Sequence, residues 1–228
     1  MAETRASSQQ RGGARVDSAR DAAYAVLKAV RVDDAYANLV LPKALAEHGL
    51  SGRDAAFATE LASGTLRMQG AYDAILDACA DKPIGKTPAK VLDALRLGAH
   101  QLLAMRVPDH AAISTTVDLV RHRANAGSAG FANAVLRKVA ARSLTEWLDL
   151  VASVGDAGDA GDAVLGVRHS HPAWVVGELR GALAASEAGH ELEALLAADN
   201  AAPRVTLVAR PGRASPEELP GERTRFSP

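Results

Sequence analysis

The chain has 228 residues and a net charge of −1, with 26 Lys and Arg against 27 Asp and Glu. Cys79 is the single cysteine, which excludes an internal disulfide framework and a cysteine-based metal site. No apolar run is long enough to span a membrane and the N-terminus lacks the apolar core of a signal peptide, so we expect a cytoplasmic protein. Aromatic residues make up only 4%, while Ala and Leu are abundant, which favours helices packed on helices and an all-α fold.

The first 16 residues are polar, rich in Gly and free of aromatic residues, so we expect a flexible basic arm. Its Arg15, together with Arg20 at the start of the first predicted helix, is a candidate for contacts with a phosphate backbone. The alternative interpretation, that the arm only increases solubility, remains open.

Residues 17–142 are predicted to form a helical domain, because the apolar residues follow a helical period and no strand pattern interrupts them. Ser18 is the expected cap of the first helix, and a short second helix is expected around residues 39–47. The later signals are the Ser51 cap, a bend near Gly64 and Gly70, the Thr87–Pro88 start, a fifth helix marked by Ile113, Val117 and Val120, and a Gly127–Gly130 loop before the Phe131 helix.

The interval 119–145 contains no acidic residue, although the whole chain is nearly neutral. Its cations are Arg121, Arg123, Arg137, Lys138 and Arg142. A local surplus of this kind indicates a polyanion partner, most simply nucleic acid. A structural interpretation remains open, because cations near the end of a helix also oppose the helix dipole.

Within this interval GFANAVLRK predicts a helix with two distinct stripes. Phe131, Val135 and Val139 share one stripe, while Asn133 and Arg137 share another. Asn133 suits contact with a base edge and Arg137 suits contact with a phosphate. The alternative for Asn133 is a local hydrogen bond that orders the preceding turn.

Residues 143–168 are expected to contain a connecting helix over Thr145–Ala152 and then an acidic Gly/Ala linker, VGDAGDAGDA. Residues 169–228 begin with a predicted pair of helices, from Pro172 to Leu183 and from Glu187 to Ala198. The segment PRVTLVARPG then predicts a strand, with Val205, Leu207 and Ala209 on one face. A single strand cannot form a sheet alone, so we expect a small and incomplete α/β segment after the helical bundle.

Several of these motifs together resemble a known family. ARDAAYAVL, RDAAFATELASGTLR, LDALRLGAHQLLAMRVPDHAAISTTVDLVR and GFANAVLRKV resemble the NusB-like RNA-binding domain. More narrowly, ELASGTLR, SHPAWVVGELRGAL and ADNAAPRVTL are similar to the N-terminal portion of the RsmB (Sun/Fmu) ribosomal RNA methyltransferases. The resemblance covers about residues 16–228, and its most specific pieces are the FxNxVLR helix and the SHPxW helix start.

That resemblance implies a protein that transfers a methyl group from S-adenosylmethionine to carbon 5 of a cytosine in 16S ribosomal RNA. The family does so with two cysteines, in Thr-Cys and Pro-Cys settings, within a Rossmann-like domain. Cys79 lies in ILDACADK, in neither setting, and no Gly-rich loop follows a predicted strand. We therefore expect no catalytic residue, no cofactor and no metal in this chain, and a role in substrate recognition without the catalytic domain.

The resemblance also gives Phe131 a second interpretation. Its stripe favours a core position, whereas the matching helix start in NusB-like domains lies near the RNA surface, where the ring could stack on a base. Two other functions remain open for the chain: an antitermination factor that binds RNA with a ribosomal-protein partner, and a protein-interaction scaffold. The SHPAW segment argues against the free-standing antitermination factor, which resembles only the first 142 residues.

Overall fold

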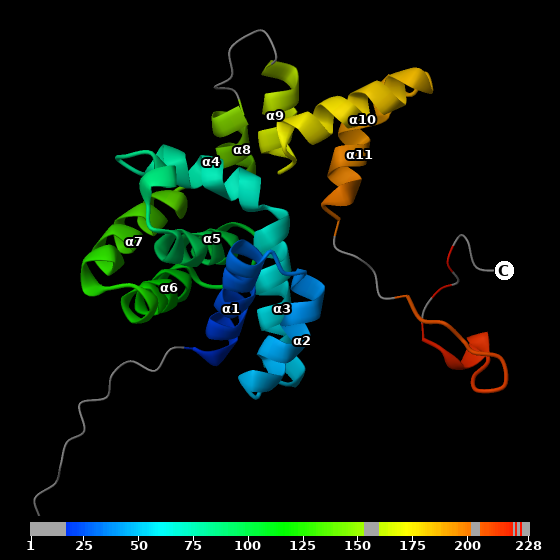
Figure 1. The fold of residues 1–228 in the computed structure, drawn as a ribbon, viewed down its shortest axis with the longest axis horizontal. Helices are drawn as coiled ribbons and strands as arrows, with labels where there is room; N and C mark the ends of the chain where they lie inside the picture. The colour runs from blue at the N-terminus through cyan, green and yellow to red at the C-terminus, as the bar shows by residue number, and fades with distance from the viewer. Residues whose placement is uncertain (1–16, 153–159, 202–205, 221, 223, 225–228) are drawn as a thin grey trace, which may run out of the picture.

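Every regular element in the described part of the chain is a helix (Figure 1). A computed structural model describes residues 17–152, 160–201, 206–220, 222 and 224. The all-α prediction is confirmed. The predicted basic arm with Arg15, residues 153–159 of the predicted linker and Val205 of the predicted strand lie outside these residues. No described helix is long and apolar enough to cross a bilayer.

Helix α5 (Ala89–Leu103) lies at the centre of the bundle and packs against five other helices (Figure 1). Its neighbours are α1 (Ser18–Asp33), α3 (Gly52–Arg67), α4 (Gln69–Cys79), α6 (Asp109–Arg123) and α7 (Ala126–Val139), while α2 (Ala37–Glu47) packs on α1 and α3. Residues 93–101 of α5 are buried without interruption. The polar residues in this run must therefore find their partners inside the protein.

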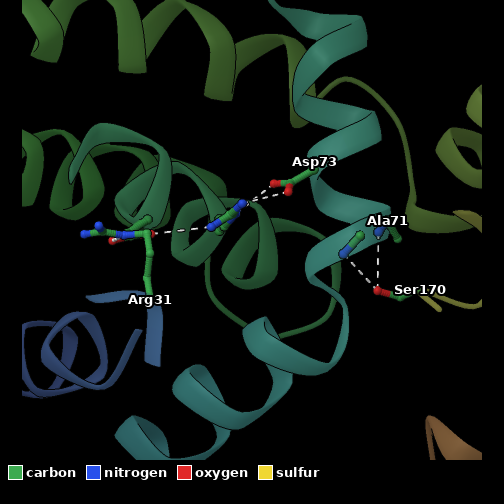
Figure 2. A network of polar contacts seen from close by, with 7 residues as sticks. Arg31, Ala71, Asp73 and Ser170 are labelled. Carbon is green, nitrogen blue, oxygen red and sulfur yellow. Dashed lines mark hydrogen bonds and ion pairs between the residues drawn. The ribbon is translucent and has the colours of Figure 1, made fainter. Parts of the chain in front are cut away.

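Asp93 and Arg96 find their partners in a network of ion pairs. Arg31 Nε donates to Asp93 Oδ2 at 2.8 Å, and Arg96 approaches the other oxygen of Asp93 at 3.5 Å. Arg96 also donates twice to Asp73, at 2.7 Å each. Figure 2 shows Arg31 and Asp73 at the two ends of this network, so two partly exposed charges on α1 and α4 pair with the buried charges of α5.

Several helix boundaries differ from the sequence predictions. The first helix is capped by Asp17 and not by Ser18, because the Asp17 carboxylate accepts from the backbone N–H of Arg20 at 2.9 Å. The predicted Gly127–Gly130 loop is wrong: both glycines lie inside α7, whose cap is Asn125. The break expected near Gly64 and Gly70 is confirmed, since α3 and α4 meet at Met68.

The later helices form a second, smaller module. It contains α8 (Leu144–Ala152), α9 (Ala160–Arg168), α10 (Ala173–Ala185) and α11 (Leu192–Asp199), with α9 packed on α4, α8 and α10. Helix α9 occupies part of the predicted acidic linker. Val176, Leu192 and Leu196 form a separate small core. Short 3-10 turns occur at Ile84–Lys86, Gly189–Glu191 and Pro216–Glu218.

The predicted strand is wrong for residues 206–210. They have no regular secondary structure, and Leu207 and Val208 are exposed. Alternating apolar residues form a strand only when a neighbouring strand accepts their backbone hydrogen bonds. The described residues contain no such neighbour.

Ser170 connects the second module to the bundle. It lies between α9 and α10 with a φ of 56°, in the left-handed region. Its Oγ accepts from the backbone N–H of Gly70 at 3.0 Å and of Ala71 at 3.4 Å (Figure 2). The second module therefore satisfies two backbone donors at the start of α4.

Candidate nucleic-acid interface

Helix α7 presents the motif residues at the surface because its other side is fixed in the core. Ala132, Val135, Leu136 and Val139 are buried against α4, α5 and α6. Phe131 is half-buried and packs at the edge of this core, while Arg137 is exposed. The two predicted stripes thus face different surroundings, and α7 has a hollow on each side.

The first hollow, which we call the Phe131 cleft, has a volume of about 520 Å³. It lies between the start of α7 and the connection from α4 to α5. Its lining residues are Asp81, Lys82, Pro83, Lys86, Thr87, Pro88, Val91, Asn125, Gly127, Ser128 and Phe131. An aromatic ring, apolar side chains and two exposed lysines in one cleft suit a nucleotide, which has a flat base and a negative phosphate.

The second hollow, which we call the Asn133 hollow, has a volume of about 330 Å³ and lies between α6 and α7. Its lining residues are His110, Ile113, Ser114, Val117, Asp118, Arg121, Asn133 and Arg137. The pairing of Asn133 with Arg137 on one stripe is confirmed, since Arg137 Nε donates to Asn133 Oδ1 at 3.5 Å. The structure therefore brings Arg121, Asn133 and Arg137 together from two helices.

The other predicted contact residues are tied to neighbouring groups. Arg20 is only 9% exposed; its Nε donates to Gln101 at 2.7 Å and its guanidinium lies 4.9 Å from the centre of the Phe57 ring. Arg123 forms an ion pair with Asp21 and lies over Tyr24. These contacts hold the bundle together, so we leave Arg20 and Arg123 out of the interface.

Lys138 and Arg142 remain accessible. Lys138 forms an ion pair with Asp81 at 2.9 Å, and this contact lowers the pKa of the Asp81 carboxyl. Arg142 lies 5.0 Å from the centre of the Trp147 ring. The interval 119–145 has no acidic residue of its own, but carboxylates from other parts of the chain pair with some of its cations. The unpaired positive charge is therefore smaller than the sequence alone suggests.

The helical bundle matches a known family. The sequence pattern of the NusB family matches residues 17–141, which is more than half of the chain. The chain belongs to the NusB family. The match ends two residues after α7, so the second module lies beyond the matched region.

Relatives of this NusB-family chain extend the similarity into the second module. A Mycobacterium tuberculosis protein named as a putative methyltransferase is 44% identical over 93% of this chain and 47% of its own length. The ribosomal RNA small subunit methyltransferase B of Pseudomonas putida is 36% identical over 82% of this chain and 39% of its own length. The chain spans about half the length of these curated relatives, or less.

A solved structure supports the NusB fold. The antitermination factor chain in a crystal structure of NusB and NusE with double-stranded RNA has a TM-score of 0.50 and 24% identity. The match covers 54% of this chain and 93% of that chain. It shows the fold alone.

Lys82 and Lys86 are site residues that sequence reasoning missed. They lie outside the interval 119–145 and reach the Phe131 cleft only because the connection between α4 and α5 folds back beside α7. The signal was present as two lysines in the polar, Pro-containing connection DKPIGKTP. These lysines are far from the basic interval in the sequence, so the charge pattern alone did not connect them with it.

Cys79, the single cysteine, lies in the core of the helical bundle. Cys79 is 1% exposed, and burial raises the pKa of its thiol to about 11. It is therefore a core residue, whereas a reactive cysteine needs an accessible thiolate. No group of three or more metal-binding side chains occurs in the described ranges.

Proposed function

We propose that this chain is the RNA-recognition region of a ribosomal RNA methyltransferase. The observation that carries the proposal is the surface of α7, where the Phe131 cleft and the Asn133 hollow lie on either side of one basic helix. The NusB fold and the methyltransferase names of the relatives support it. The proposed ligand is small-subunit ribosomal RNA, contacted by Phe131, Asn133, Arg137, Lys138, Arg142 and Arg121.

S-adenosylmethionine does not fit the described residues. Its expected site, where a strand is followed by a Gly-rich loop and a helix, requires a strand, and residues 17–152 and 160–201 form helices and their connections only. We place methyl transfer in the part of the relatives that this chain does not cover. For this chain the proposal is therefore binding, without a chemical step.

The test is binding of the full chain to fragments of small-subunit ribosomal RNA and to a scrambled RNA over a series of salt concentrations. We expect one fragment to be preferred, with affinity that falls steeply as salt rises. Arg137→Ala and Arg142→Ala should each reduce the slope of log affinity against log salt by about one unit for every phosphate that the arginine binds. Lys43→Ala is the matched control, because Lys43 is exposed on α2, outside the proposed interface, and forms an ion pair with Glu47.

A result with equal binding to the fragments and the scrambled RNA, at every salt concentration, would contradict the proposal. The similarity to the NusB chain keeps an antitermination role as a second candidate. That candidate requires a ribosomal-protein partner to bind the bundle and to raise its RNA affinity. Measuring the RNA affinity of the full chain at increasing concentrations of the ribosomal-protein partner distinguishes the two candidate functions. An affinity that rises with the partner supports the antitermination role, and an unchanged affinity supports the methyltransferase role.

A further inference from the structure

We propose that the Asn133 hollow binds one unstacked base of a single-stranded stretch of RNA and distinguishes between bases through the Asn133 amide. This inference rests on the proposed function and adds a position at which sequence is recognised. The Phe131 cleft, on the other side of α7, is then a neighbouring nucleotide site and not the place of recognition.

The hollow has a size and an apolar lining that suit a nucleobase. Its volume of about 330 Å³ lies within the range of small-molecule sites, roughly 300–1,000 Å³. Ile113 and Val117, one turn apart on α6, line the hollow with half-buried apolar side chains. An apolar lining of this kind favours the faces of a nucleobase, whereas a phosphate gains nothing from it.

The Asn133 amide supplies the hydrogen-bonding groups. It can donate and accept at once, which lets it bond to two adjacent atoms on a base edge. Its partner in the structure is Arg137 at 3.5 Å, which is long beside the usual distance of about 2.9 Å. This contact is weak, so the amide can exchange it for a base without a large loss.

Two arginines give the hollow its positive charge. Arg137 has no carboxylate partner in the described part of the chain, and Arg121, whose partner is Asp118 on the same helix, is exposed. They lie on α7 and α6 respectively, so a nucleotide in the hollow has a guanidinium from each helix. Single-stranded RNA matches this arrangement, because its bases are free to leave the stack while its phosphates stay at the rim.

The experiment measures the affinity of the full chain for four homopolymeric RNA oligonucleotides of equal length, one for each base. We expect the wild-type chain to prefer one of them. Asn133→Ala should lower affinity for that oligonucleotide roughly 5- to 100-fold and bring it to the level of the others, as the loss of a bidentate base contact does. Arg142→Ala is the matched control, and it should lower all four affinities by a similar factor.

Ser114→Phe is a second test that does not depend on Asn133. Ser114 is exposed at the rim, so a phenyl ring there fills the hollow and leaves the core unchanged. We expect the preference among oligonucleotides to disappear, with the salt dependence retained and the thermal unfolding temperature close to that of wild type.

The outcomes separate this inference from the proposed function. Equal wild-type affinity for all four oligonucleotides, or a preference that survives both Asn133→Ala and Ser114→Phe, overturns base recognition while RNA binding stands. No salt-dependent binding to any RNA overturns both. Loss of ribosomal-protein binding in Ser114→Phe, with unchanged RNA affinities, assigns the hollow to a protein and also overturns the inference.

Discussion

The hydroxyl of Ser170 lies 3.0 Å from the backbone nitrogen of Gly70, one hundred residues earlier in the chain, and accepts its hydrogen bond. Met68, at the capping position of α4, has no side-chain hydrogen bond to offer the first turn. Ser170 therefore does for α4 what a serine at the helix start normally does, but from the other module. The start of α4 is complete only when the second module is in place.

Replacement of Ser170 tests this tertiary cap. Ser170→Ala should lower the free energy of unfolding by about 0.5–2 kcal/mol, the usual cost of removing a cap. Ser170→Gly removes the same hydroxyl but relieves the left-handed backbone, so it should be less destabilising than Ser170→Ala. Faster hydrogen exchange at the amides of Gly70 and Ala71 in both variants is the direct measurement. Unchanged exchange there would contradict the cap.

Two glycines in helices should respond in opposite ways to alanine. A Cβ at Gly64 would lie 2.3 Å from Cε1 of His100, whose buried ring has little room to move. Gly64→Ala should therefore destabilise the protein by about 1–3 kcal/mol through overpacking. A Cβ at Gly130, inside α7, meets nothing within 4 Å, so Gly130→Ala should stabilise by about 0.5–1 kcal/mol. Urea unfolding compares them, and equal effects would refute the close approach.

His100 makes stability depend on pH. Burial, with a smaller effect from the charge of Arg67, lowers the pKa of His100 to about 4. The folded protein thus prefers the neutral imidazole more than the unfolded chain does, in which the pKa is about 6.5. The stabilisation is complete above pH 6.5 and is lost as the pH falls towards 4, by about 3 kcal/mol at most.

The control for this pH dependence is His100→Gln, which cannot titrate and keeps an amide near the Tyr72 hydroxyl, the 2.8 Å partner of His100 Nδ1. The difference in unfolding free energy between wild type and His100→Gln should fall as the pH drops from 6.5 to about 4.5. A difference that stays constant over this range would show that His100 titrates alike in both states.

Phe131 should matter more for RNA than for stability. Its ring is half-buried at the edge of the core and lines a cleft, so Phe131→Leu keeps part of its packing. We expect a loss of about 1 kcal/mol in stability or less, and a loss of about 1–3 kcal/mol in RNA binding if the ring stacks on a base. Val135→Ala is the matched control, with reduced stability and unchanged affinity per folded molecule. The reverse pattern would make Phe131 a core residue only.

The sequence predicted most of the helices because their signals are local, although it assigned α9 to a linker and the start of α7 to a loop. The spacing of apolar residues predicted the bundle, and Asn133 with Arg137, four residues apart, could be placed on one face without a structure. The strand over residues 206–210 failed for the opposite reason, since a strand depends on a partner elsewhere. Asp17, and not its neighbour Ser18, caps the first helix. Both residue types are good helix caps, so the sequence does not decide between them.

The site could be predicted only in part, because its charges come from distant segments. Arg20 satisfies the simple rule for a phosphate contact, yet the structure turns it inward to Gln101. Lys82 and Lys86 lie outside the basic interval, yet they line the Phe131 cleft. Each of these placements depends on which helices pack together, which a count of charges along the chain does not contain.

The chain has two tryptophans, and they lie in contrasting surroundings. Trp147 is 3% exposed, with its indole N–H donating to the Val139 carbonyl at 2.8 Å, while Trp174 at the start of α10 is 72% exposed. Their fluorescence should therefore separate by wavelength and by sensitivity to an aqueous quencher. Excitation of the unlabelled protein then reports on the contact between α8 and α7 through Trp147 and on α10 through Trp174, so that local opening at either place can be followed independently.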